Sequence, residues 1–388
     1  MTKLNFLVHE TFRSNPAFEL IESGKINQLG LDALAGLFND PEVFGIFKQK
    51  NGEHSTPIKL AYKEVALLFY FLQTPNTLPA YFKTVFDDEA NKMLAKLVME
   101  GIFEIEHQQQ FLSGAAAQFV IYQQYTNKEI IAKKPLFQLS EKAIQYAIQL
   151  KNTDSASLIS KLYCYNTSPF LNHQENNLNN LESVEHFLHI QKGAVLRNEM
   201  LKAWNRHEPS EKYKWLSWTK KEISTLPVGS EKVYKIYISP VLSAFPHVFG
   251  KSVPIITASK TFSFKIGIDR FGLLRPDKFV VYFTDYNDLT EAAILLKKAL
   301  KEFEAQGVPF TASLDDCGML SWGIDPPNNG TNENEDGVSW RAGVAEKLAS
   351  AIMLAKKENL DKKAAYEFVM NKISLEGIDP NNWMYYRN

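Results

Sequence analysis

The segment Phe262–Phe283, FSFKIGIDRFGLLRPDKFVVYF, carries more structural information than any other part of this chain. Two apolar runs rich in β-forming residues, Phe262–Ile268 and Phe279–Phe283, flank a short link with turn residues, which predicts two neighbouring strands. The link holds Arg270 and Arg275, two of only seven arginines in the chain. Because a guanidinium binds carboxylate or phosphate as a fork, this half is expected to hold an anionic or peptide-like partner.

The composition is that of an ordinary globular protein. The chain has 388 residues, of which 45% are hydrophobic and 22% charged, enough for two or three domains. The net charge of −1 gives no overall field to attract nucleic acid. Cys164 and Cys317 are far apart and read as reduced thiols, which favours the cytoplasm. No signal peptide or bilayer-length apolar run is evident, so no membrane partner is expected.

Residues 1–125 are expected to form a helical, winged-helix-like peptide-recognition domain. Residues 1–57 read as helical, and two further helices extend to residue 100. The runs Ile102–His107 and Phe111–Ser113 then predict a β-hairpin, the wing.

A winged helix binds either DNA or a peptide, and the charges favour the peptide. The expected recognition helix begins with Asp87, Asp88 and Glu89, and the wing carries Glu104 and Glu106. These carboxylates would repel phosphate, so a DNA-binding regulator is the weakest alternative and no nucleic-acid partner is expected. The wing residues predicted to contact a peptide are Ile102, Phe103, Glu104, Ile105 and Phe111.

The rest of the chain is expected to form two further domains. Residues 126–226 read as a helical linker domain, and Pro227 marks a boundary. Residues 227–388 alternate strand and helix patterns and predict an α+β domain with a mostly antiparallel sheet. The whole chain is therefore predicted to be α+β.

Three basic residues are candidates for a reactive site. Lys265 is a single charge in an apolar strand: facing a cleft, it would have a lowered pKa and act as a general base, and facing solvent it would have no such role. Arg275 can clamp an anion or pair with Asp277. Arg341 lies in the first turn of an expected helix, where a cation opposes the dipole, so a carboxylate or a bound anion is expected beside it.

Trp322 and Trp340 flank a polar loop and can line a peptide groove or pack in the core. Glu182, His186 and His189 share one helical face, but no fourth metal ligand is evident. The usual nucleotide-binding and hydrolase motifs are missing from the sequence. No metal and no cofactor are therefore expected.

Residues 232–355 carry five motifs that together resemble the phosphothreonine-lyase-like family of bacterial type III effectors and of one class of lanthipeptide synthesis. The motifs are KIYISP (235–240), FSFKIG (262–267), RPDKFVVYF (275–283), GVPFTASL (307–314) and SWRAGVAEKLASAI (339–352). The resemblance implies a lyase that eliminates phosphate from phosphoserine or phosphothreonine in a peptide. It places Lys265, Arg275 and Arg341 at basic positions of the site.

The expected domain arrangement is also similar to partner proteins of ribosomal-peptide maturation systems, which present precursor peptides to multinuclear non-heme iron oxidases. This resemblance implies an accessory protein that binds a precursor peptide and presents it to a modifying metalloenzyme, such as an iron oxidase. We take that function as the first expectation, and the peptide lyase as the alternative.

Overall fold

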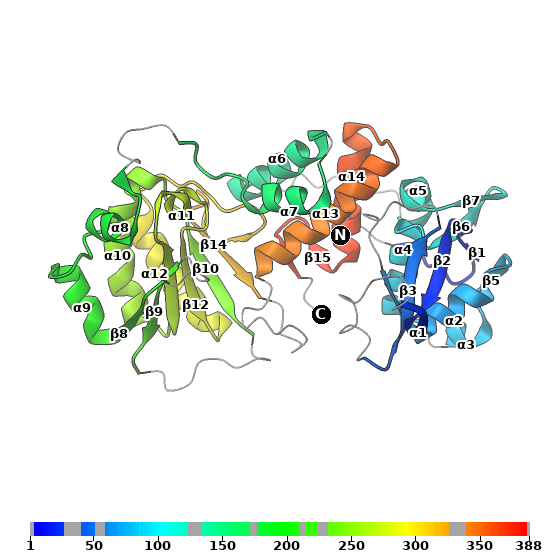
Figure 1. Ribbon diagram of the computed structural model, residues 1–388, viewed down its shortest axis with the longest axis horizontal. Coiled ribbons are helices and arrows are strands. Elements are labelled where there is room, and N and C mark those ends of the chain that lie inside the picture. The colour runs from blue at the N-terminus through cyan, green and yellow to red at the C-terminus, as the bar shows by residue number, and fades with distance from the viewer. Residues whose placement is uncertain are drawn as a thin grey trace. The chain divides into compact units, whose positions relative to one another are not determined.

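The computed structural model divides the chain into two compact units. Unit 1 comprises Met1–Glu129 and Ala351–Gly377, and unit 2 comprises Ile130–Ser350 and Ile378–Asn388. Both contain helices and antiparallel strands, so the predicted α+β class is confirmed (Figure 1). The structure describes residues 4–26, 40–50, 59–84, 86–122, 134–151, 153–170, 177–209, 215–222, 232–325 and 339–385.

Unit 1 contains two small antiparallel sheets, with strand orders β5-β1-β6-β7 and β2-β3-β4. The strands are β1 (Thr11–Ser14), β2 (Phe18–Glu22), β3 (Val43–Gln49), β4 (Lys59–Tyr62), β5 (Asn76–Thr77), β6 (Phe103–His107) and β7 (Gln110–Leu112). The helices are α1 (Ser23–Ile26), α2 (Lys63–Phe71), α3 (Ala80–Thr84), α4 (Asp88–Met99), η3 (Gly114–Ala117), α5 (Gln118–Ile121) and α14 (Lys362–Leu375).

The expectation that residues 1–57 are helical is wrong, because this segment contains β1, β2 and β3. Strand β3 is rich in aromatic and β-branched residues and pairs with β2 on one side and β4 on the other. Gly45 allows the β2 backbone to approach, since a Cβ there would lie 2.0 Å from the carbonyl oxygen of Ile21. The winged-helix arrangement of this unit is not confirmed.

The helix and hairpin expected near residue 100 are present. Asp87 caps α4 by accepting a hydrogen bond from the Ala90 N–H at 2.9 Å. Strands β6 and β7 form an antiparallel hairpin. Its turn contains Gln108 and Gln109, with positive φ angles of 49° and 65°.

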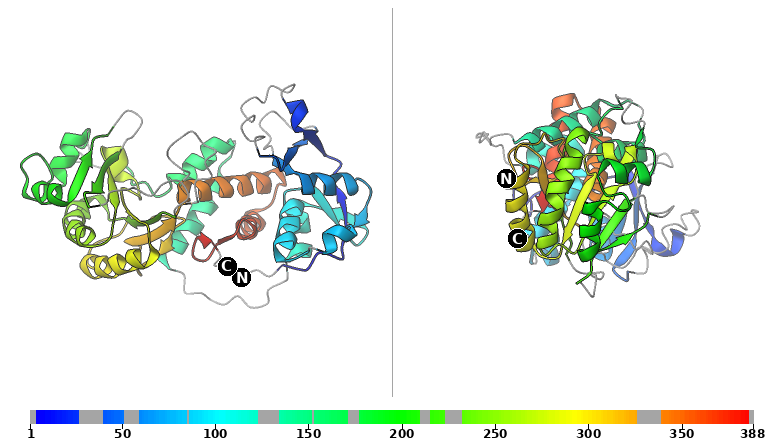
Figure 2. Two further views of the ribbon diagram at one scale, coloured as in Figure 1. Left: turned by 90° about the horizontal axis from the view of Figure 1, so that it is seen from below. Right: turned by 90° about the vertical axis from the view of Figure 1, so that its left-hand side faces the viewer.

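Unit 2 is built on a seven-stranded antiparallel sheet with the order β13-β14-β10-β12-β11-β9-β8 (Figures 1 and 2). The strands are β8 (Trp204–His207), β9 (Trp215–Lys220), β10 (Tyr234–Ile238), β11 (Ser263–Gly267), β12 (Phe279–Phe283), β13 (Ala312–Ser313) and β14 (Leu320–Ile324); β15 (Ile378–Asp379) and β16 (Met384–Tyr385) form a separate pair. The helices are α6 (Pro135–Gln149), α7 (Ser155–Tyr163), α8 (Leu181–Phe187), α9 (Val195–Ala203), η5 (Leu242–Ala244), α10 (Phe245–Ala258), α11 (Arg270–Leu274), α12 (Tyr286–Leu300) and α13 (Trp340–Lys357), which ends in unit 1.

The sequence placed a domain boundary at residue 227, but unit 2 also includes helices α6 to α9. Strands β8 and β9 precede that residue and belong to the main sheet, where β9 pairs with β11. Strand pairing between distant segments, invisible in local composition, brings them into one unit.

The two faces of the main sheet differ sharply. One face is apolar and packs against α8, α9, α10 and α12, with Trp218, Phe264 and Phe279 fully buried in this core. The opposite face carries Lys235 and Lys265 next to a small apolar cluster of Tyr237, Val280 and Val308, and we call it the polar face. Residues directly across an antiparallel pair point to the same side of the sheet. Lys265 lies across from Ser217, and Lys235 lies across from Tyr282. None of the helices within the described residues is long and apolar enough to cross a membrane.

Helix α14 joins unit 1 through a buried ion network. Glu100, at the end of α4, is 7% exposed and lies 2.9 Å from Lys372 of α14 and 2.5 Å from Lys59 of β4. Lys372 also pairs with Glu376 at 3.3 Å. Burial alone would raise the pKa of Glu100, but the charges of Lys372 and Lys59 outweigh it and the pKa is lowered.

Removing this carboxylate charge is expected to destabilise unit 1. Glu100→Gln leaves the buried Lys372 and the half-buried Lys59 without their shared anion, which costs about 3 kcal/mol. Urea unfolding measures the change, and hydrogen exchange in α4 and α14 assigns it to unit 1. Glu89→Gln is the matched control, because Glu89 pairs with Lys92 on the exposed side of α4. Equal losses in both variants would contradict the assigned role of Glu100.

Candidate functional site

The centre of the candidate site is the buried carboxylate of Asp277, just before β12. Arg275 forms a fork with it, from Nε to Oδ1 and from Nη2 to Oδ2, both at 2.8 Å. Arg341 of α13 places Nη1 2.7 Å from the same Oδ2. One carboxylate therefore joins two guanidiniums from distant parts of the sequence.

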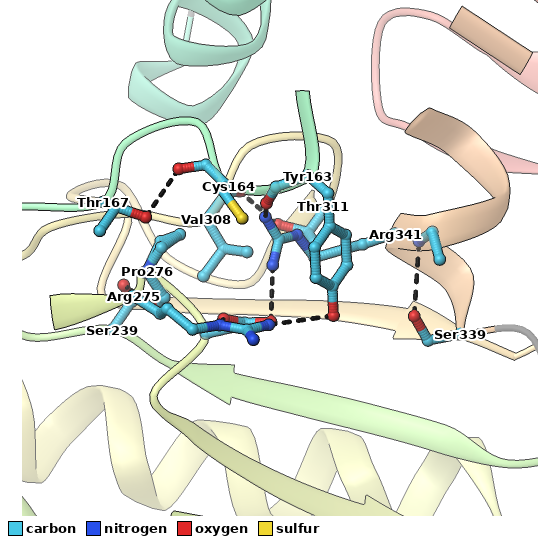
Figure 3. A network of polar contacts seen from close by, with 12 residues as sticks. Tyr163, Cys164, Thr167, Ser239, Arg275, Pro276, Val308, Thr311, Ser339 and Arg341 are labelled. Atoms are coloured by element: carbon cyan, nitrogen blue, oxygen red, sulfur yellow. Dashed lines mark hydrogen bonds and ion pairs between the residues drawn. The ribbon is translucent and has the colours of Figure 1, made fainter. Parts of the chain in front are cut away.

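Tyr163, at the end of α7, lies between these two arginines (Figure 3). Its ring centroid is 5.1 Å from Cζ of Arg275 and 4.8 Å from Cζ of Arg341. Its hydroxyl accepts a hydrogen bond from Arg275 Nη2 at 3.0 Å, and its main-chain carbonyl accepts one from Arg341 Nη2 at 2.6 Å. Tyr163 thus fixes the spacing of the two guanidiniums.

The local structure explains how the sequence places these groups. Asp269 caps the short helix α11 by accepting from the Gly272 N–H at 2.8 Å. The helix ends at Leu274, and Arg275 adopts an extended conformation with φ −63° and ψ 148°. Proline at 276 favours that conformation in the residue before it. Arg275 and Asp277 therefore stand two residues apart on an extended segment that leads into β12.

Electrostatics holds the cluster ionised. Burial alone would raise the pKa of Asp277, but the charge of Arg341 and the hydrogen bonds from Arg275 hold it well below its usual range. Burial alone would lower the pKa of Arg275, but Asp277 raises it above its usual value. Arg341 is 1% exposed, whereas the Arg275 side chain is 26% exposed. Arg275 is therefore the arginine of this pair that a ligand can reach.

Lys265 lies beside this cluster on the polar face of the sheet. Its Nζ is 4.7 Å from the ring centroid of Trp215 and 5.7 Å from that of Tyr282. Cζ of Arg275 is 5.2 Å from the Trp215 centroid, so the two cations share this indole. No carboxylate among the described residues pairs with Lys265. Burial, together with the nearby charge of Lys235, lowers the pKa of Lys265 to about 8.

The second lysine of this face, Lys235, is paired. It forms an ion pair with Asp325, and its Nζ is 5.1 Å from the Tyr282 centroid. Asp325 also accepts a hydrogen bond from the Trp340 N–H at the start of α13, at 2.9 Å. Among the described residues this region combines four cations with two carboxylates, and these six groups together are net positive.

The structure brings Lys265, Arg275 and Arg341 into one region of unit 2, and it separates the two predicted tryptophans. Trp322 packs on the apolar face, with ring centroids 4.8 Å from Tyr286 and 6.4 Å from Tyr234. Trp340 lies on the opposite face against Gly323 and donates from its indole to the Phe310 carbonyl at 2.9 Å.

The predicted peptide-binding residues of the hairpin lie in unit 1. Ile102, Phe103 and Ile105 are buried in its core. Glu104 accepts from Arg13 Nε at 2.5 Å, and the Arg13 guanidinium lies 4.3 Å from the Phe111 ring centroid. The part of the hairpin open to a partner is therefore the backbone of β7, an edge strand.

Sequence reasoning did not identify Tyr163, Trp215, Tyr282, Lys235 or Asp325 as members of the site. Lys235 carried a usable signal, since it is a charge in the alternating strand 233–238. The aromatic residues carried none, because most aromatic side chains in strands and at helix ends pack in cores. No group of three His, Cys, Asp or Glu residues in the described ranges could hold a metal ion.

No family model and no curated protein matches the sequence. Among solved structures, the effector protein from Pseudomonas syringae pv. tomato strain DC3000 is 14% identical with a TM-score of 0.39, over 66% of this chain and 99% of that one.

Two phosphothreonine lyases are also similar. The type III effector/phosphothreonine lyase OspF from Shigella flexneri is 12% identical with a TM-score of 0.28, over 36% of this chain and 80% of that one. The VirA (SpvC) phosphothreonine lyase effector from Chromobacterium violaceum is 10% identical with a TM-score of 0.28, over 49% and 87%. By both measures the similarity is weak.

Neutralising Asp277 is expected to destabilise unit 2 strongly. Asp277→Asn leaves Arg341 buried without its anion, at a cost of about 3–5 kcal/mol in the free energy of unfolding near neutral pH. Because the pKa of Asp277 is depressed in the folded state, its stabilising effect is lost as the pH falls below about 4. The difference in the free energy of unfolding between wild type and Asp277→Asn should therefore become smaller in acid.

Urea unfolding at a series of pH values measures this difference. Asp316→Asn is the control, since Asp316 forms an exposed pair with Lys297 and its loss should change little. A constant difference at every pH would contradict the assigned ionisation of Asp277.

Proposed function

We propose that unit 2 is a lyase that binds a phosphorylated serine or threonine side chain of a peptide on the polar face of its sheet and eliminates the phosphate. The observation that carries the proposal is Lys265, a partly buried amine with a pKa near 8 and no carboxylate partner among the described residues, beside the guanidinium of Arg275. Such an elimination needs a base for the Cα proton and a cation for the phosphate. Lys265 and Arg275 supply these two groups side by side at the Trp215 ring.

In the proposed reaction, the neutral Lys265 Nζ takes the proton from Cα of the phosphorylated residue. The electrons of that C–H bond form the Cα=Cβ double bond, and the Cβ–O bond breaks with its electron pair leaving on phosphate. The products are a dehydroamino acid and inorganic phosphate, and no oxidant or reductant is required.

Arg275 is suited to hold the phosphate. Its Nε and Nη2 are bound by Asp277 and Tyr163, while Nη1 has no hydrogen-bond partner in the part of the chain that the structure describes. A nitrogen of a fixed, partly exposed guanidinium can donate to a phosphate oxygen with little loss of side-chain entropy. Arg341 is buried, so in this proposal it acts by holding Asp277 and Tyr163.

The pH dependence of the reaction tests the base. The rate of phosphate elimination should rise through a pKa of about 8, because only the neutral form of Lys265 accepts a proton. Lys265→Met should abolish elimination from a phosphoserine or phosphothreonine peptide, measured as loss of phosphoric acid by mass spectrometry.

Lys251→Met is the control for this experiment. Lys251 lies on α10, on the other side of the sheet's core, and within the described ranges its Nζ contacts the Phe303 ring at 5.7 Å and no group of the site. Retention of activity in Lys265→Met, or a flat pH profile, would refute the base assignment.

The accessory role is the second candidate, favoured by the position of β7. This strand is an edge of the sheet β5-β1-β6-β7, so its outer backbone groups can pair with an added strand of a precursor peptide. In that role the chain would present the peptide to a modifying enzyme, such as an iron oxidase.

Hydrogen exchange tests strand addition. The amides of Gln110–Leu112 should gain protection when the precursor peptide is added, because new interstrand hydrogen bonds form at that edge. The opposite edge, β5, is the internal control and should not change. Unchanged exchange in β7 at saturating peptide would rule out this mode.

A further inference from the structure

A buried amine–amide link lies behind the candidate site. Lys278 follows Asp277 in the chain, is 0% exposed, and has no carboxylate hydrogen-bond partner among the described residues. Its Nζ donates to the main-chain carbonyl of Pro240 at 2.8 Å and to the side-chain carbonyl of Gln306. Burying an amine among neutral oxygens costs free energy unless hydrogen bonds replace its lost hydration. The two acceptors must therefore point at Nζ.

Gln306 uses every polar group it has. Its Nε2 donates to the main-chain carbonyls of Asn166 at 2.5 Å and Leu274 at 2.9 Å. Its backbone N–H donates to the Ser239 carbonyl at 2.8 Å, and its backbone carbonyl accepts from Asn166 Nδ2 at 2.8 Å. One side-chain amide thus binds two segments that are far apart in the sequence.

Those two segments carry the residues that meet at the site. Leu274 directly precedes Arg275, and Asn166 lies in the turn after Tyr163. Asn166 has a positive φ of 68°, a conformation that asparagine tolerates and that reverses the chain here. The Leu274 carbonyl also accepts from the Ser168 N–H at 3.0 Å. The link therefore clamps the backbone behind the contact between Arg275 and the Tyr163 hydroxyl.

We infer that Gln306 is a positioning residue for the Arg275–Tyr163 pair, and that Lys278 sets the orientation of the Gln306 side-chain amide. An ammonium group only donates, so the Gln306 carbonyl oxygen must face Lys278, and Nε2 must then face the carbonyls of Asn166 and Leu274. Burial lowers the pKa of Lys278 to about 7. The neutral amine keeps N–H donors, and the carbonyls of Asn166 and Leu274 still require a donor at Nε2, so the orientation persists above neutrality. The link to anion binding rests on the proposed function; the positioning itself does not.

The first test reads Arg275 directly. The chain has only seven arginines, so ¹⁵N-arginine labelling gives few Nε–H signals. Gln306→Leu should speed exchange of the Arg275 Nε–H, which donates to Asp277, by about tenfold, because the backbone segment before it is released. Two Nε–H groups are internal references and should not change: that of Arg13, bound to Glu104, and that of Arg206, buried in unit 2.

A second variant separates positioning from mere packing. Gln306→Glu keeps an acceptor for Lys278 but replaces the Nε2 donor by an oxygen that faces two carbonyls. If Nε2 positions the segments of Asn166 and Leu274, Gln306→Glu should speed exchange of the Arg275 Nε–H as much as Gln306→Leu does. Wild-type exchange of the Arg275 Nε–H in Gln306→Glu would overturn the inference. Gln145→Glu, on the exposed side of α6, is the matched control.

A phosphopeptide-binding experiment distinguishes this inference from the proposed function. A phosphothreonine peptide should bind Gln306→Glu about tenfold more weakly than wild type, while the pKa of Lys265 in the pH profile stays unchanged. If wild type binds no phosphopeptide, the proposed function fails, and the exchange of the Arg275 Nε–H still decides the positioning role. Weakened binding with unchanged exchange would reject positioning by Gln306.

Discussion

The carboxylate of Asp277 is the group around which the site of unit 2 is organised. A carboxylate that is 4% exposed is stable in a protein interior only when ion pairs and hydrogen bonds replace its lost hydration. Arg275 supplies both hydrogen bonds of a fork, and Arg341 supplies a second charge. Through Arg341, the first turn of α13 is attached to the segment that leads into β12.

The main sheet supports the ion cluster around Asp277 because one of its faces forms the core and the other carries the charged side chains. The apolar face buries large aromatic side chains against four helices and provides the stability of unit 2. The other face is then free to carry charge, and the pleat alone places Lys235 and Lys265 on it. Their environments diverge: Lys235 is paired with Asp325, whereas Lys265 rests on aromatic rings.

The site therefore contains two kinds of residue: some hold other side chains in place, and others are accessible enough to react with a ligand. Arg341 and Asp277 are buried and paired with each other, and the half-buried Tyr163 accepts a hydrogen bond from Arg341. Lys265 and Arg275 keep partial exposure and meet at Trp215. Behind them, Gln306 binds the carbonyls on either side of the Arg275–Tyr163 contact. Bonded supports around a few partly exposed groups are the usual basis of a preorganised site.

The sequence by itself determined the local features of this protein. The α+β class, helix α4, the hairpin of β6 and β7, and the strands around Lys265 follow from periodicity and turn residues. The need of Arg341 for an anionic partner also followed from its place in the first turn of a helix.

Only the tertiary structure decided which partners these residues meet. The carboxylate beside Arg341 is Asp277, and the ring between the two arginines is Tyr163, both far away in sequence. The strands within residues 1–57 and the inclusion of β8 and β9 in the main sheet likewise depend on pairing with distant segments. A linear pattern records the periodicity of each element, but it holds no information on which element lies across from it, because that choice minimises the free energy of the whole packed unit.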